Sequence, residues 1–192
     1  MTAKIYTLAP RATQMLFLHV ELDDVEPKVW REVAVPETVT LPKLHMILQY
    51  AMGWCGCHMH EFQFVDESYG TPDPDWGGAV LAESRVTLKR ALGRTKNFTH
   101  LHDFGDGWTH SMRVRRAVPR DPALTQAICL GGENACPPED VGGPWGYGEL
   151  LEIIADPAHE EHDAMLEWCG GSFDAKRFDT AAVDRLLAEI KV

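Results

Sequence analysis

Two pairs of neighbouring segments alternate apolar and polar residues, and a short turn joins the members of each pair. The first pair is Gln14–Leu22 and residues 28–35; the second is residues 97–104 and 108–118. Alternation with a period of two residues is typical of half-buried strands, and strands joined by a short turn pair antiparallel. The chain therefore has to fold around antiparallel hairpins whose apolar faces need a cover.

The sequence predicts that helices supply this cover. Residues 41–52 carry apolar side chains at helical spacing between Thr40, which suits an N-cap, and Gly53, which suits a C-terminal stop. Further helices are predicted at 88–92, 148–155, 159–169 and 179–190, a strand at 60–65, and loops at 66–79 and 119–148. This pattern indicates an α+β fold with a mixed or antiparallel sheet. We predict one domain over residues 14–192, preceded by a flexible leader over residues 1–13.

Charge is distributed unevenly along the chain. The formal net charge is −11, and residues 131–192 alone hold 14 acidic and 4 basic side chains. Residues 85–120 instead hold nine basic side chains and two acidic ones. A nucleic-acid surface is one interpretation of this basic segment, but the overall negative field would repel phosphate. We therefore favour a solvated strand face and expect no nucleic-acid partner.

The five cysteines and the N-terminal segment indicate where in the cell the protein is located. The apolar run at residues 15–18 is far shorter than the roughly 20 residues of a membrane helix, and the pattern of a secretory signal is missing. An odd number of cysteines then favours reduced thiols in a cytoplasmic protein without a membrane partner. Cys55 and Cys57 lie two positions apart, which predicts a poor geometry for a mutual disulfide and departs from the usual zinc spacing.

The segment Cys57-His58-Met59-His60-Glu61-Phe62 holds two histidines separated by one residue. On a strand both imidazole rings would point to the same face and could reach one metal ion. The alternative is that both rings pack beside Phe62 and hydrogen-bond to the backbone. His58 and His60 are therefore candidate metal ligands.

A second segment, Asp103-Phe104-Gly105-Asp106-Gly107-Trp108-Thr109-His110, surrounds the turn of the second hairpin. His110 is a third candidate metal ligand, which Asp103 or Asp106 could orient by a hydrogen bond. Trp108 is a candidate contact for a ligand. The alternative is an ordinary turn whose aspartates bind nearby backbone N–H groups.

The third segment runs from Cys136 through Pro137-Pro138-Glu139-Asp140 to Trp145-Gly146-Tyr147. Two prolines stiffen the chain before an acidic pair that could bind a metal ion or act in acid–base catalysis. Trp145 and Tyr147 are candidate ligand contacts. The alternative is a rigid packing loop whose acids cap backbone donors.

Together these segments resemble the Ri-plasmid (pRi) open-reading-frame-three-like family, a bacterial and archaeal domain family of unknown function. The matching pieces are Pro27-Lys28-Val29-Trp30-Arg31, Leu44-His45 through Gln49, Gly53-Trp54, residues 58–62, residues 103–110, Cys136 through Tyr147, Asp156-Pro157, Trp168 and Phe173-Asp174. The resemblance spans roughly residues 14–187 and implies a single α+β domain without implying an activity. The departures are His100 and His102, where aromatic residues are expected, and Cys55 and Cys57, where small polar or acidic residues are more usual.

Three functions remain open on the sequence. The first is a non-catalytic binding or adaptor module, whose Pro-Pro-Glu-Asp loop meets an unknown protein, peptide or small-molecule ligand with help from the aromatic residues Trp108, Trp145 and Tyr147. The function ranked third is that of a nucleic-acid-associated protein of a mobile element, which would bind nucleic acid through the basic segment at residues 85–120.

The second function is a metal-assisted hydrolase. Its predicted site consists of His58, His60 and His110 as ligands, Glu139 or Asp140 as fourth ligand or general base, and Asp103 or Asp106 as the orienting carboxylate. A divalent ion such as zinc suits these donors and lowers the pKa of a bound water towards about 7.

Overall fold

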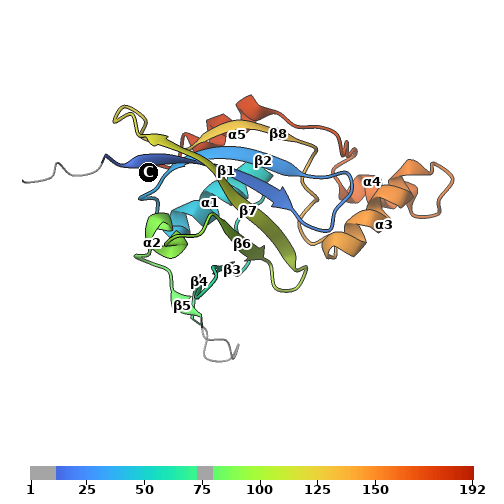
Figure 1. Cartoon of the computed structure of the whole chain (residues 1–192). Helices are drawn as coiled ribbons and strands as arrows, with labels where there is room; N and C mark the ends of the chain where they lie inside the picture. The colour runs from blue at the N-terminus through green and yellow to red at the C-terminus, as the bar shows by residue number, and fades with distance from the viewer. Residues whose placement is uncertain (1–11, 73–79) are drawn as a thin grey trace, which may run out of the picture.

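The structure is a computed structural model that describes residues 12–72 and 80–192 (Figure 1). The strands are β1 (Gln14–Leu22), β2 (Trp30–Pro36), β3 (His60–Gln63), β4 (Ser68–Gly70), β5 (Leu81–Ala82), β6 (Asn97–His102), β7 (Trp108–Pro119) and β8 (Ile128–Glu133). The helices in these ranges are α1 (Leu41–Met52), α2 (Leu88–Leu92), α3 (Gly143–Ala155), α4 (His162–Trp168) and α5 (Thr180–Leu187).

The strands form one mixed sheet in the order β5-β4-β3-β6-β7-β1-β2-β8. Both predicted hairpins are present, because β1 pairs with β2 and β6 pairs with β7, each antiparallel. Strand β1 also pairs with β7 and so joins the two hairpins at the centre of the sheet. β4 and β5 run parallel, which makes the sheet mixed. The predicted α+β fold is confirmed.

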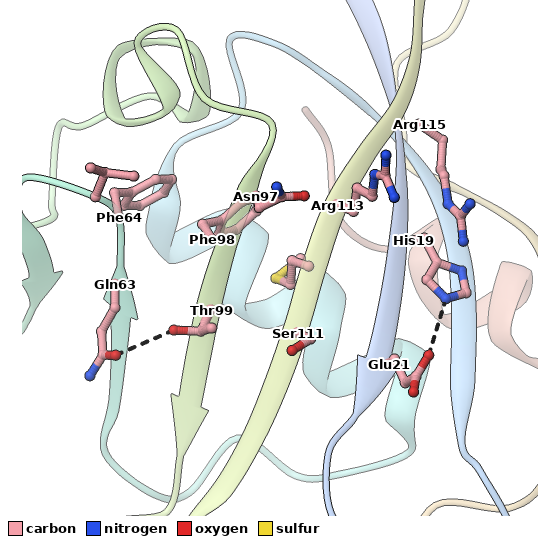
Figure 2. Close-up of a pocket in the computed structure, with 12 residues that line it drawn as sticks. His19, Glu21, Gln63, Phe64, Asn97, Phe98, Thr99, Ser111, Arg113 and Arg115 are labelled. Atoms are coloured by element: carbon pink, nitrogen blue, oxygen red, sulfur yellow. Dashed lines mark hydrogen bonds and ion pairs between the residues drawn. The ribbon is translucent and has the colours of Figure 1, made fainter.

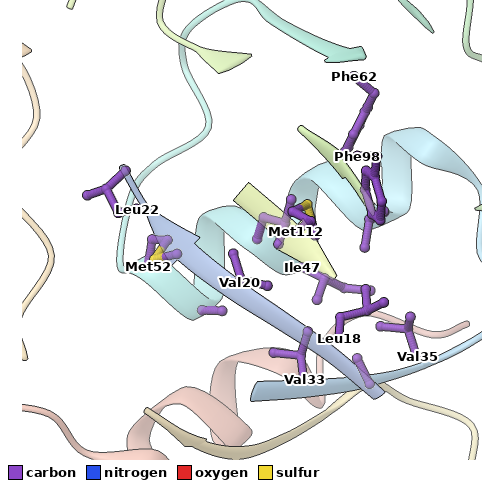
Figure 3. Packing of buried hydrophobic residues seen from close by; sticks show 14 of the residues in the cluster. Leu18, Val20, Leu22, Val33, Val35, Ile47, Met52, Phe62, Phe98 and Met112 are labelled. Carbon is purple, nitrogen blue, oxygen red and sulfur yellow. The ribbon is translucent and has the colours of Figure 1, made fainter. Parts of the chain in front are cut away.

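Helices α1 and α5 cover one face of this sheet (Figure 1). Alternation along β1 points Leu18 and Val20 into this layer, where both are fully buried. From α1, Ile47 packs against this layer (Figure 3), and Ile47 and Leu48 are both fully buried. Removing one such side chain costs about 2–5 kcal/mol, so this layer contributes strongly to the stability of the sheet that positions the loops at its ends.

The opposite face of the sheet is open and carries a shallow hollow of about 610 Å³ (Figure 2). Arg113 and Arg115, two members of the predicted basic segment, line this hollow together with His19 and Glu21. Charges of both signs therefore lie side by side on the open face, as in a solvated strand face.

Several predicted boundaries differ from the structure. The predicted loop over 119–148 is wrong, because β8 pairs there with β2 and α3 begins at Gly143. The predicted strand at 60–65 ends at Gln63, and the predicted loop at 66–79 contains β4 in its described part. Residues 1–11 of the predicted leader and residues 73–79 of that loop lie outside the described residues. In the described ranges, no helix has the length and apolar character needed to cross a membrane.

Candidate functional site

Three connecting segments meet at one end of the sheet. They are the α1–β3 loop (residues 53–59), the β6–β7 turn (residues 103–107) and the β8–α3 loop (residues 134–142). The backbone N–H of Cys55 donates to Oε1 of Glu139 at 3.1 Å, which ties the first segment to the third. The N–H of Gly142 donates to Oδ2 of Asp106 at 3.2 Å, which ties the third to the second. These contacts bring together segments that are far apart in the sequence.

The β6–β7 turn is built around Asp103. Its Oδ1 accepts the N–H of Gly105 at 2.9 Å, and its backbone carbonyl accepts the N–H of Gly107. Asp103 has φ +54° and Gly107 has φ +72°, a region that Asp tolerates and Gly adopts freely. The local hydrogen bonds use Oδ1 and leave Oδ2 facing His58.

Asp140, in the β8–α3 loop, also has an unusual backbone conformation. Asp140 has φ +60°, and Gly142 and Gly143 follow with φ +92° and +72°. A Cβ atom on Gly143 would overlap the carbonyl oxygen of Asp106. A glycine is therefore required where α3 begins against the β6–β7 turn, and this close approach sets the position of Asp140.

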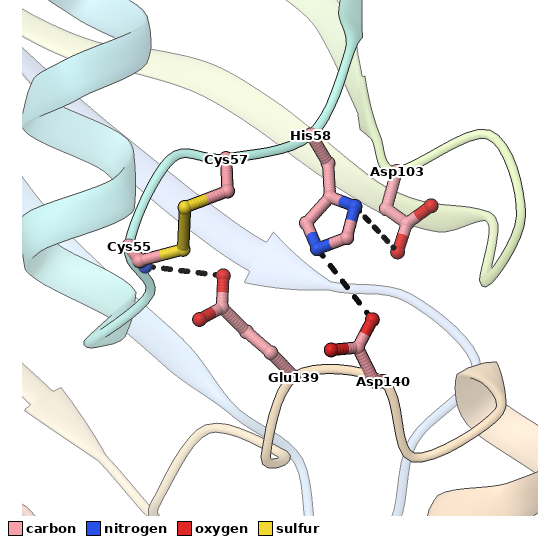
Figure 4. Close-up of a disulfide and its surroundings, with 6 residues drawn as sticks. All are labelled: Cys55, Cys57, His58, Asp103, Glu139 and Asp140. Atoms are coloured by element: carbon pink, nitrogen blue, oxygen red, sulfur yellow. Dashed lines mark hydrogen bonds and ion pairs between the residues drawn. A yellow bond between two sulfur atoms is a disulfide. The ribbon is translucent and has the colours of Figure 1, made fainter.

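His58 lies between the two aspartates (Figure 4). Its Nδ1 is 3.4 Å from Oδ2 of Asp103, and its Nε2 is 3.6 Å from Oδ1 of Asp140. One ligand atom from each of these three residues lies within 4.8 Å of the other two. Among the described residues, no other group of three or more His, Cys, Asp or Glu side chains converges in this way. His58 and Asp103 are half-buried, whereas the side chain of Asp140 is 75% exposed, so solvent reaches the group from the Asp140 side.

Cys55 and Cys57 form a disulfide beside this group (Figure 4). The prediction of reduced thiols is therefore wrong for this pair. Gly56 has φ +71°, and the tight turn brings the two Cα atoms to 5.5 Å, within the 4.4–6.8 Å typical of disulfides. Both cysteines are exposed, whereas Cys129, Cys136 and Cys169 are free thiols.

The sequence of the chain matches a known protein family. The family model of the plasmid pRiA4b ORF-3-like proteins matches residues 14–182. The chain belongs to the plasmid pRiA4b ORF-3-like protein family. This confirms the family resemblance predicted from the sequence.

Two relatives of this pRiA4b ORF-3-like protein extend the comparison. It is 47% identical over 173 residues to the uncharacterized protein y4hQ of Sinorhizobium fredii (strain NBRC 101917 / NGR234), covering 87% of this chain and 84% of the relative. The crystal structure of protein of unknown function MM3350 from Methanosarcina mazei Go1 superposes with a TM-score of 0.81 at 31% identity. That match covers 89% of this chain and 98% of the other. Both relatives are described as uncharacterized or of unknown function, so the family relation establishes the fold and leaves the activity to be argued from the site.

The predicted ligand set of His58, His60 and His110 is not brought together in this family member. His60 instead places Nε2 3.0 Å from Oε1 of Glu83 and stacks on His45 with ring centroids 3.6 Å apart. His110 is fully buried, with Nδ1 3.1 Å from the carbonyl oxygen of His100. The strand argument fails for His58 because β3 begins only at His60, so His58 belongs to the loop and turns towards the acidic residues.

The other predicted site residues divide between the surface and the core. Trp108 and Tyr147 are buried at 1% and 0% exposure, so neither side chain can contact a partner directly, contrary to the prediction. Trp145 is 78% exposed on the first turn of α3. Asp106 caps Gly142 instead of orienting His110, and Glu139 binds the backbone of Cys55.

Sequence reasoning missed a cluster of histidines buried between the sheet and α1. Nδ1 of His45 lies 3.1 Å from Nε2 of His100, and Nδ1 of His100 lies 3.4 Å from Nδ1 of His110. Burial, reinforced by the neighbouring imidazoles, lowers the pKa of His45 to about 2, and burial lowers the pKa of His110 to about 4. The rings are therefore neutral at pH 7 and act as packing groups. The sequence did contain a signal. Phe98, His100, His102 and Phe104 occupy every second position, so their side chains share one face of the predicted strand.

Proposed function

We propose that this protein binds a divalent metal cation through His58, Asp103 and Asp140. The observation that carries the proposal is the convergence of one imidazole and two carboxylates, from three separate segments, to within 4.8 Å. Ligand atoms about 2.0–2.2 Å from a zinc ion lie about 3–3.6 Å from one another. The closest contacts of His58 are 3.4 Å from Nδ1 to Asp103 and 3.6 Å from Nε2 to Asp140. They use different ring nitrogens, so one carboxylate has to shift towards the nitrogen that binds the cation.

The donor set supports a hard or borderline cation. Carboxylate oxygens suit Mn²⁺ and Mg²⁺, and imidazole suits Zn²⁺ and Fe²⁺. Because three protein ligands leave coordination positions open and Asp140 is 75% exposed, water or a substrate has access to the cation.

A hydrolytic role is the first extension of this proposal. A cation with three protein ligands and an open position lowers the pKa of its bound water. Glu139 is the neighbour of Asp140 in the chain, is half-buried and carries its carboxylate on the same loop, so it is the residue we favour as the general base. The predicted hydrolase thus keeps Glu139 and Asp140 but exchanges His60 and His110 for Asp103.

Partner binding by the same loop is the second candidate function. It rests on Trp145, which is 78% exposed just after the Pro-Pro-Glu-Asp segment, since isolated large aromatic side chains on a surface suit protein or peptide contacts. A cation at Asp140 would stiffen the loop that leads into the helix carrying this residue. Nucleic acid is the least favoured partner because of the net charge of −11. We also propose a cytoplasmic location.

The proposal is tested by titrating the protein with Mn²⁺ and Zn²⁺ in a calorimeter. We expect one equivalent to bind, and we expect His58→Ala, Asp103→Asn and Asp140→Asn each to weaken binding by at least about tenfold. The amide oxygen introduced by Asp103→Asn can still accept the N–H of Gly105, so this variant keeps the turn. His159→Ala and Asp66→Asn change exposed residues of the same types and should bind like the wild type. Equal binding by all five variants, or no binding, would show that His58 and its aspartates form an ion-pair cluster only.

A further inference from the structure

We propose that reduction of the Cys55–Cys57 disulfide converts the site at His58 into a thiolate site for Zn²⁺. This inference rests on the proposed function, because it concerns the same cation site, and it adds the two cysteines as ligands. It identifies the redox state of the protein as the factor that selects which class of cation binds.

The two cysteines and the cation site share the same pair of loops. Cys57 directly precedes His58 in the α1–β3 loop, and the N–H of Cys55 donates to Glu139 at 3.1 Å. Asp140, the next residue after Glu139, lies 3.6 Å from His58. Figure 4 shows the disulfide, the His58 ring and the two acidic side chains gathered between these loops. Thiols released at Cys55 and Cys57 therefore lie on the loop that carries His58, next to the loop that carries Glu139 and Asp140, and the turn at Gly56 has to rotate to bring them onto the cation.

The disulfide is accessible to a reductant. Both cysteines are exposed, so a small dithiol can attack either sulfur atom. In the exchange, the two thiols of the dithiol are oxidised to its own disulfide, and two electrons and two protons pass to Cys55 and Cys57. When Zn²⁺ then binds, both thiol protons leave to the solvent, because the thiolate is the metal-binding form.

Reduction changes the chemical class of the ligand set. With the disulfide closed, the site offers one imidazole nitrogen and carboxylate oxygens, and such sites suit hard and borderline cations. Two thiolates with His58 and one carboxylate make a four-coordinate set of the kind that zinc prefers. Sulfur ligands of one zinc ion lie about 3.8 Å apart, which Cα atoms 5.5 Å apart in the turn at Gly56 permit.

The experiment compares cation affinities of the full chain in its two redox states. One sample is reduced with a dithiol and desalted without oxygen, and the other is kept as the disulfide. Competition with a chromogenic chelator then gives the affinity for Zn²⁺, and calorimetry gives the affinity for Mn²⁺. We expect reduction to tighten Zn²⁺ binding by at least about tenfold, since loss of even an outer hydrogen-bond partner of a ligand costs about 10- to 100-fold. Mn²⁺ affinity should change by less than about threefold, because thiolates are poor partners for hard cations.

Matched variants test whether Cys55 and Cys57 cause the change in Zn²⁺ affinity. Cys55→Ser/Cys57→Ser should bind Zn²⁺ like the oxidised wild type in both samples, whereas Cys169→Ser, which changes a free thiol elsewhere, should keep the redox dependence. Reduced protein substituted with Co²⁺ should show a thiolate-to-cobalt absorption band that the double variant lacks. Equal Zn²⁺ affinity in the two redox states, or a gain that survives in the double variant, would overturn the inference. Mn²⁺ binding to the oxidised protein reports separately on the proposed function, so the failure of one is distinguishable from the failure of the other.

Discussion

Nε2 of His58 lies 3.6 Å from Oδ1 of Asp140, at the point where the α1–β3 loop meets the β8–α3 loop. Neither loop contains a helix or strand at this point, so their separation depends on the direct bond from Cys55 to Glu139 and on contacts with the β6–β7 turn beneath them. The bond from Gly142 to Asp106 is one such contact, and the close approach of Gly143 to the same turn is another. Substitutions at the base of the β8–α3 loop should therefore change the affinity of the cation site.

Substituting Gly143 tests this dependence. Gly143→Ala forces a Cβ against the carbonyl oxygen of Asp106 at a residue with φ +72°, so we expect it to lower the free energy of unfolding by about 1–3 kcal/mol and to weaken Mn²⁺ binding. Gly148→Ala is the control, because it lies in the same helix with open space around its Cβ position and should stabilise by up to about 1 kcal/mol. Urea denaturation measures both, and similar behaviour of the two variants would show that the close approach at Gly143 is unimportant.

Buried neutral histidines should make the fold acid-sensitive. Burial lowers the pKa of His110 to about 4 from an ordinary value of 6.5. Below pH 6.5 the unfolded chain therefore takes up a proton that the folded chain refuses until near pH 4. The stabilisation is complete above the ordinary pKa and is lost as the pH falls through this window. We expect His110 alone to remove on the order of 2 kcal/mol of stability between about pH 7 and about pH 5.

The measurement is the free energy of unfolding by urea at several pH values in that window. His110→Gln should flatten the pH dependence by the amount assigned to this residue, whatever its effect on stability at neutral pH. His159→Gln, at an exposed position, should leave the slope as it is in the wild type. A slope unchanged by His110→Gln would mean that this imidazole does not stay neutral in the folded protein.

Tyr147 offers a test of the core beside the site. Its ring is fully buried, and among the described residues its hydroxyl has no hydrogen-bond partner. A buried hydroxyl without a partner costs about 1–3 kcal/mol, so Tyr147→Phe should leave the free energy of unfolding unchanged or raise it by about 1 kcal/mol. Thermal and urea denaturation of the variant measure the change. A loss of stability would indicate that the hydroxyl is bonded to a buried water molecule.

The central fold was predictable because its signals are local. The alternation along β1 and the helical spacing along α1 both follow from neighbouring residues. Strand β8 was missed because Gly131 and Gly132 interrupt the alternation, and glycine is depleted in strands. Gly132 is needed for a tertiary reason, since a Cβ there would come within 2.8 Å of Phe178 and Arg31. A sequence pattern does not reveal such a contact.

The candidate site was only partly predictable for a similar reason. His58, Asp103, Glu139 and Asp140 each stood out by residue type and by their place in the segments at 57–62, 103–110 and 136–147. Their grouping depends on how three loops approach one another, and the spacing of His58 and His60 favoured the wrong partner. The Cys55–Cys57 disulfide was missed because it depends on a positive φ at Gly56, which the residue type permits but does not impose.

The most direct test of the central claim is a crystal of the protein soaked in Mn²⁺ and measured at a wavelength where manganese scatters anomalously. We predict one strong anomalous peak bounded by His58, Asp103 and Asp140, about 2.0–2.3 Å from a ring nitrogen of His58. Loss of the peak in Asp140→Asn crystals would confirm the ligand set. A peak at another place, or none while the His58 ring stays between the two carboxylates, would contradict the account.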